Sequence, residues 1–84
     1  MFIEIEISNE EIKNIPQKKY DEYTSELRSR IGEVYPDSKI FILTSDNDVT
    51  LCTVDGFHDN NSVHLITHEI QKDVFNHGYW RNNL

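Results

Sequence analysis

The sequence predicts a small domain of the α/β (α+β) class, with the element order β-α-β-β-α and a three-stranded mixed sheet that carries two helices on one face. Three observations predict this fold. An opening segment alternates apolar and acidic side chains, as a half-buried strand does. Two longer segments repeat apolar side chains every three or four residues, as amphipathic helices do. Two short segments rich in β-formers lie between those helices, and the 84 residues fit one domain over 1–84.

The first predicted strand is Phe2–Ser8. Its side chains alternate between two sets, Ile3, Ile5 and Ile7 on one face and Glu4 and Glu6 on the other. Because a strand repeats every two residues, the isoleucines share the buried face and the glutamates share the wet one. The polar segment 8–14 is predicted to form a turn.

The first predicted helix begins near Pro16, because the fixed φ of proline suits a first helical turn. Its apolar stripe consists of Tyr20, Tyr23, Leu27, Ile31 and Val34. Proline disfavours helical geometry in the residue before it, so Tyr35-Pro36-Asp37 is predicted to end the helix.

Two further strands are predicted over Lys39–Thr44 and Val49–Val54, with the polar cluster Ser45–Asp48 between them. A strand, a short polar turn and a strand are typical of a β-hairpin. The right-handed crossover rule makes the first two strands of the domain parallel if they are neighbours, and the third then runs antiparallel.

The second predicted helix begins at Asn61 or Ser62, either of which is a good N-cap, and ends at Gly78. Its predicted inner stripe is Val63, Ile66, Ile70 and Val74, broadened by Leu65 and Phe75. Beyond the helix we expect Tyr79 and Trp80 to fold back on the core and residues 81–84 to fray.

Charge and cysteine content limit the classes of function. The chain has 15 Asp and Glu against 8 Lys and Arg, a formal net charge of -7, which disfavours direct contact with nucleic acid or an anionic membrane. The acidity suits a basic protein partner, or it serves solubility alone. The lone Cys52 predicts a reducing compartment. With no signal peptide and no apolar run longer than Ile40–Leu43, we expect a soluble, cytoplasmic protein.

Candidate catalytic and metal-binding side chains are few. His64 and His68 share a helix face at i and i+4, but the glutamate of zinc proteases and a second thiol are missing from the sequence. Cys52 lies in an apolar strand, where a cysteine is more often a small core residue than a nucleophile. Three aspartates near the predicted hairpin lack the spacing of a calcium loop. The sequence therefore predicts no enzyme, no metal site and no cofactor.

Three stretches resemble the DinI family (damage-inducible protein I) of small bacterial, plasmid and prophage proteins. They are the opening strand Met1–Ile7, the helix end Glu26-Leu27-Arg28-Ser29-Arg30-Ile31 followed by Tyr35-Pro36-Asp37, and Ile70-Gln71 followed by a closing Trp80. The resemblance covers nearly the whole chain and rests on the order and spacing of these motifs. It implies a three-stranded sheet with two helices on one side.

The resemblance also implies a function. Well-known members of that family bind RecA, the recombinase whose filament on single-stranded DNA triggers the SOS response, and modulate it by stoichiometric binding. An acidic ridge on their last helix is thought to imitate DNA and to compete for the basic loops of RecA. If a partner binds through the last helix, as the resemblance implies, we expect its exposed residues Glu69, Lys72, Asp73 and Asn76 to make the contact.

The last helix departs from the family pattern. Residues 59–80 carry three acidic side chains against one lysine, whereas residues 1–37 carry nine acids against five bases. The alternative is a divergent interaction module with another protein partner, such as a virulence regulator or an antirepressor, acting as a monomer or weak homodimer. Such a module would use the open sheet face or self-associate through it, and Glu4 and Glu6 are predicted to lie there beside either Phe41 with Leu43 or Ile40 with Ile42.

Overall fold

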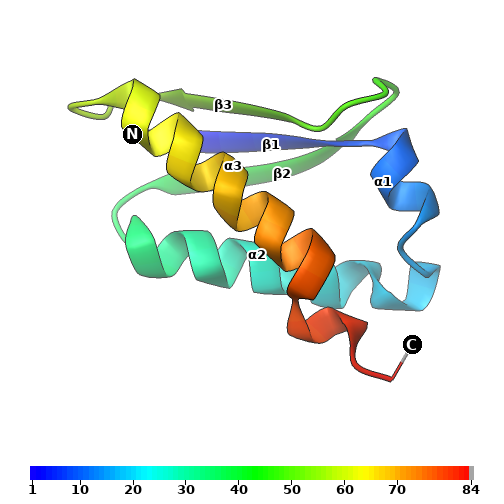
Figure 1. Ribbon diagram of the computed structural model, residues 1–84. Coiled ribbons are helices and arrows are strands. Elements are labelled where there is room, and N and C mark those ends of the chain that lie inside the picture. The colour runs from blue at the N-terminus through cyan, green and yellow to red at the C-terminus, as the bar shows by residue number, and fades with distance from the viewer. Residues whose placement is uncertain (84) are drawn as a thin grey trace.

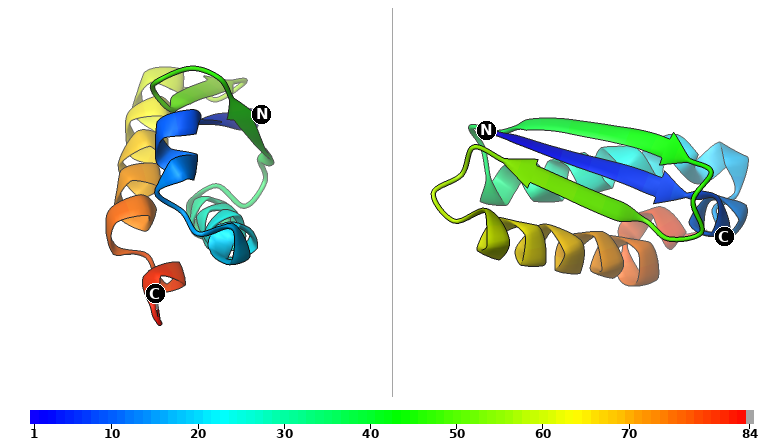
Figure 2. Two further views of the ribbon diagram at one scale, coloured as in Figure 1. Left: turned by 90° about the vertical axis from the view of Figure 1, so that its right-hand side faces the viewer. Right: turned by 90° about the horizontal axis from the view of Figure 1, so that it is seen from above.

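The computed structural model describes residues 1–83 (Figure 1). The strands are β1 (Phe2–Ser8), β2 (Lys39–Ser45) and β3 (Leu51–Asp55). The helices are α1 (Asn9–Lys13), α2 (Tyr20–Val34) and α3 (Asn60–His77), with the short 3-10 helices η1 (Gln17–Lys19) and η2 (Tyr79–Arg81). The predicted α+β class is confirmed: the strands form one mixed sheet, and α2 and α3 pack on the same face of it (Figure 2).

The strand order is β2-β1-β3, with β1 parallel to β2 and antiparallel to β3. The predicted β-hairpin was wrong, because β2 and β3 lie on opposite sides of β1. Their connection crosses the end of β1, where the Ser8 backbone N–H donates to Thr50 Oγ1 at 3.0 Å and that of Asn9 donates to the Asn47 carbonyl at 3.3 Å. From β2 across β1 to β3 is two strand spacings, about 10 Å, and a short loop can span that distance.

The core is built around the isoleucines of β1. Ile3, Ile5 and Ile7 are fully buried, as their alternation with glutamates predicts. Because β1 is the central strand, its inner face lies beneath both helices, with α2 on the side of β2 and α3 on the side of β3. The buried apolar residues of the core are Ile3, Ile5, Ile7, Ile15, Tyr23, Leu27, Ile31, Val63, Val74 and Trp80.

Residues 9–13 form the helix α1, not the predicted turn. The Ser8 hydroxyl oxygen caps it by accepting from the Glu11 backbone N–H at 3.2 Å. Serine followed three residues later by glutamate is a capping signal that the sequence contains. The short helix places the Glu11 side chain over one end of the core, next to α3.

Helix α2 begins at Tyr20, four residues later than Pro16, which precedes the 3-10 turn η1. Tyr23, Leu27 and Ile31 are buried as predicted, and Tyr20 is partly buried against the core. Val34 is half exposed because it is the last residue of α2, where the chain leaves the helix toward β2. The helix ends at the predicted place, before Tyr35-Pro36.

Helix α3 is capped by Asp59 rather than by Asn61 or Ser62. The Asp59 carboxylate accepts from both the backbone N–H and the hydroxyl of Ser62, at 3.2 and 2.8 Å. These hydrogen bonds hold the pKa of Asp59 below its ordinary value. The helix ends at Gly78 as predicted, and a Cβ there would approach the Val74 carbonyl oxygen to 2.5 Å.

The segment after α3 folds back through Trp80 but not through Tyr79. Trp80 is buried against the Tyr23 ring, with centroids 5.3 Å apart, whereas Tyr79 is 81% exposed. The Glu26 carboxylate accepts from the backbone N–H groups of both residues at 2.9 Å. Arg81, predicted to fray, ends η2 and lies 4.5 Å from the centroid of the Trp80 ring, a cation–π geometry.

None of the helices in residues 1–83 is both long enough and apolar enough to cross a membrane.

Candidate functional site

Helix α3 buries two polar side chains, Thr67 and Gln71, and exposes two apolar ones, Leu65 and Ile66. Its buried residues are Val63, Thr67, Gln71 and Val74. Leu65 is 65% exposed and Ile66 is 43% exposed, so the prediction that both belong to the inner stripe was wrong. Ile70 and Phe75 are partly buried against the core, at the edges of the inner stripe.

A polar network fixes this rotation of α3. The Gln71 side-chain amide donates to Glu11 Oε2 at 2.8 Å and to the hydroxyl oxygen of Tyr23 at 3.2 Å. These bonds satisfy an amide that would otherwise be costly to bury. Thr67 is fully buried one turn earlier, and its hydroxyl oxygen has no hydrogen-bond partner among residues 1–83.

The outer surfaces of α2 and α3 meet in a groove with two adjoining hollows. The apolar hollow, about 410 Å³, is lined by Leu65, Ile66, Glu69 and Ile70 together with Arg30 and Asp73. The acidic hollow, about 700 Å³, shares Arg30 and Asp73 and adds Ser25, Glu26, Ser29, Glu33, His77 and Tyr79. We call these two hollows together the α2–α3 groove.

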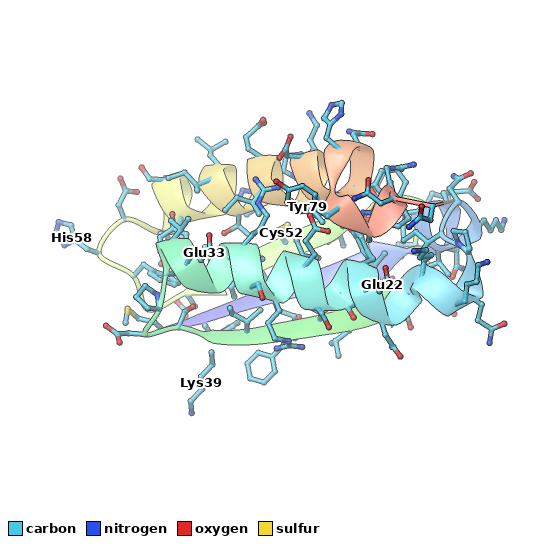
Figure 3. All side chains as sticks on the ribbon, turned by 90° about the horizontal axis from the view of Figure 1, so that it is seen from below. Glu22, Glu33, Lys39, Cys52, His58 and Tyr79 are labelled. Carbon is cyan, nitrogen blue, oxygen red and sulfur yellow. The ribbon has the colours of Figure 1, made fainter. Side chains whose placement is uncertain are left out.

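The ion pair between Arg30 and Asp73 bridges the α2–α3 groove, with Nη1 and Oδ2 2.7 Å apart. Of the groove residues, four are carboxylates and Arg30 is the one side chain that is always cationic. Figure 3, seen from the side of α2, shows Glu33 near the end of that helix and Tyr79 between the helices. The groove therefore joins an apolar hollow to an acidic hollow through the Arg30–Asp73 ion pair.

The four predicted partner-binding residues all lie exposed on α3 but face two sides. Glu69 and Asp73 line the α2–α3 groove. Lys72 instead lines a hollow on the α1 side of the helix, and Asn76 lines none of these hollows. The structure thus brings the two acids of the set together and separates them from Lys72.

Glu4 and Glu6 lie on the sheet face opposite the helices. In the strand register Glu4 pairs with Phe41 and Glu6 pairs with Leu43. Phe41 and Leu43 are therefore the apolar pair on this face, while Ile40 and Ile42 pack against the core. This face lies across the sheet from the α2–α3 groove (Figure 2).

A third hollow, about 360 Å³, lies between α1, α3 and the loop before β3. It contains Glu11, whose pKa is raised because half-burial disfavours the carboxylate. Hydrogen bonds from Thr50 and Gln71, and the nearby His68, oppose that rise. Sequence reasoning missed this cluster, because the predicted inner stripe of α3 did not include Gln71.

The nucleophile and metal-ligand candidates lie on two elements, Cys52 on β3 and His64 and His68 on α3. Burial raises the pKa of the Cys52 thiol to about 11, because this residue lies on β3 and packs against the core. His64 is exposed and His68 lines the hollow near α1. Within residues 1–83, no three His, Cys, Asp or Glu side chains are grouped so that they could hold a metal ion.

Comparison with known proteins adds no evidence about function beyond the fold and the groove. No family model, no curated protein and no solved structure matches this chain. The resemblance to the DinI family therefore stays a prediction from motifs.

Proposed function

We propose that this protein acts by stoichiometric binding to another protein, as a DinI-like modulator of RecA filaments or of another component of an SOS or prophage switch. The partner docks on the α2–α3 groove. Glu69 and Asp73 contact basic side chains of the partner, and Leu65 and Ile66 contact its apolar side chains. Lys72 and Asn76 contribute contacts at the α1 side of α3.

The observation that carries this proposal is the rotation of α3. The helix buries the polar Thr67 and Gln71 and exposes Leu65 and Ile66, although its sequence offers enough apolar residues for a fully apolar inner face. Burying a leucine or isoleucine side chain contributes about 1.5–3 kcal/mol. Contact with a partner recovers that contribution, which is a physical reason for an apolar surface on a small acidic protein.

The charge of the groove supports a basic partner. Four carboxylates lie around a single guanidinium, and the whole chain has a net charge of -7. Long-range attraction then raises the rate of encounter with a positively charged surface, such as one that binds DNA. The resemblance to the DinI family names the basic DNA-binding loops of RecA as such a surface and the last helix as the contact, and of the groove acids Glu69 and Asp73 lie on that helix.

Retention by RecA filaments on single-stranded DNA tests the proposal directly. We expect the wild type to be retained at low salt and released as salt is added, because exposed ion pairs are screened. The variant Glu69→Lys/Asp73→Lys is expected to bind at least about tenfold more weakly. Leu65→Ser is expected to weaken retention similarly without lowering the thermal midpoint, since this side chain is mostly exposed.

The matched control is Asp37→Lys/Asp46→Lys, which changes the charge equally at two exposed positions that do not line the groove. It should bind like the wild type. Absence of wild-type retention at low salt, with a known DinI-family protein retained in parallel, would rule out the RecA partner. Equal weakening by the groove variant and the control would instead show that only net charge matters.

A further inference from the structure

One face of the sheet stays uncovered by any helix of residues 1–83 (Figure 2). The register places three rows of side chains on it, one for each strand. The rows are Lys39, Phe41, Leu43 and Ser45 on β2, Phe2, Glu4 and Glu6 on β1, and Leu51, Thr53 and Asp55 on β3. In Figure 3 the Lys39 side chain points away from the helices.

The outer rows of this face present large apolar side chains. Phe41 is 46% exposed, Leu43 47% and Leu51 44%. The Phe2 ring packs edge-on against Phe41, with centroids 6.4 Å apart. A sheet face that only met water would carry polar residues at these alternate positions, so this face has the composition of a contact surface.

The central row is acidic. Glu4 lies between Phe41 and Thr53, and Glu6 lies between Leu43 and Leu51. Residues two apart on a strand are separated by about 6.8 Å, so the two carboxylates form a short negative line flanked by apolar side chains. The described residues of this face hold one cation, Lys39, which lies at the end of β2 opposite Asp55 across the sheet.

This charge pattern disfavours a second copy of the chain as the occupant. In a two-fold stack of two such faces, the central strands meet, and the Glu4 and Glu6 pairs of both copies come together. Burying like charges against each other is strongly unfavourable. A basic occupant removes the repulsion and satisfies both carboxylates.

We propose that the uncovered sheet face binds a basic amphipathic helix of a partner protein. Lysines or arginines at i and i+4 of that helix are about 6 Å apart along its axis, which matches the spacing of Glu4 and Glu6. Apolar residues on either side of these cations contact Phe41, Leu43 and Leu51. The bound helix completes a three-layer arrangement in which both sheet faces are covered.

This surface is independent of the α2–α3 groove, because the sheet separates the two. The proposal therefore goes beyond the proposed function and predicts a protein with two docking faces. Each face is tested by its own variants, so the failure of one leaves the other standing.

The test is an NMR titration of the full chain with a synthetic helical peptide that carries lysines at i and i+4 between leucines. A second peptide, with glutamates in place of those lysines, is the control ligand. We expect the lysine peptide to shift the amide signals of β1, β2 and β3, and the glutamate peptide to shift none. Glu4→Lys/Glu6→Lys should weaken binding at least about tenfold, and so should Leu43→Ser, which changes a half-exposed side chain.

Two controls make the outcome decisive. Asp37→Lys/Asp46→Lys and Glu69→Lys/Asp73→Lys change the charge equally elsewhere and should bind the lysine peptide within about twofold of the wild type. Shifts confined to α2 and α3, or equal weakening in all three double variants, would overturn the proposal. So would a wild-type dimer in sedimentation that Leu43→Ser dissociates, because a second copy would then be the occupant.

Discussion

Replacing Thr67 by valine is expected to stabilise the protein. Thr67 is fully buried in α3, and its hydroxyl oxygen has no hydrogen-bond partner among the described residues. Valine has the same shape and a similar helix propensity, so the change removes one buried polar group and little else. Leaving such a group unpaired costs about 1–3 kcal/mol, and we expect a gain of about 1–2 kcal/mol in the free energy of unfolding.

Urea unfolding at neutral pH measures this gain. The midpoint should rise while the slope m stays constant, because the surface exposed on unfolding is unchanged. For a domain of this size, about 1 kcal/mol corresponds to a rise of about 4–8 °C in the thermal midpoint. Binding through the α2–α3 groove should be unaffected, since the substitution lies on the inner face of α3.

Thr24→Val is the matched control. Thr24 also lies in a helix, but its hydroxyl donates to the Asp21 carbonyl at 3.2 Å near the surface of α2. That variant should be neutral or slightly destabilised. A Thr67→Val variant that is destabilised, or within about 0.5 kcal/mol of the wild type, would refute the reasoning, because the hydroxyl would then have a partner such as the carbonyl one turn earlier.

Two further predictions follow from the pKa values of buried groups. Burial raises the pKa of Cys52 from 9.0 to about 11, so iodoacetamide at about pH 8 should alkylate the native thiol roughly 100-fold more slowly than the urea-unfolded one; a ratio near one would contradict the buried position. Burial raises the pKa of Glu11 above its ordinary value of 4.5. The folded state therefore binds the carboxyl proton more tightly than the unfolded state does. The stability gained in this way is present below pH 4.5 and is lost as the pH rises through the folded-state pKa. Urea unfolding of the wild type and of Glu11→Gln should show the wild type losing stability relative to the variant across that window; a constant difference would mean that Glu11 is solvated.

The sequence predicted the structure correctly where a residue pattern is compatible with only one local structure. The alternation in β1, the stop at Tyr35-Pro36 and the glycine end of α3 are all local signals, and each was confirmed. The short helix α1 was missed although Ser8 and Glu11 have capping spacing. That signal was outweighed by the polar, turn-like composition of the segment.

The candidate site was only partly predictable. Glu69 and Asp73 could be named from the family resemblance, but the Arg30–Asp73 bridge joins residues 43 positions apart, a pairing set by how α2 and α3 cross. Leu65 and Ile66 were placed inside because a helix with apolar residues on several sides has no unique inner face. The buried amide of Gln71 selected the actual face through Glu11 and Tyr23.

By itself the sequence determined the α+β class, the burial of the β1 isoleucines and the placement of Glu4 and Glu6 on the opposite face of that strand, because hydrophobic periodicity acts over a few neighbouring residues. Only the tertiary structure decided that β1 lies between β2 and β3, that α3 turns Leu65 and Ile66 outward, and that Phe41 and Leu43 share the uncovered face. Those outcomes depend on contacts between segments far apart in the chain, where the best-packed and best hydrogen-bonded arrangement of the whole overrides the local preference of each part.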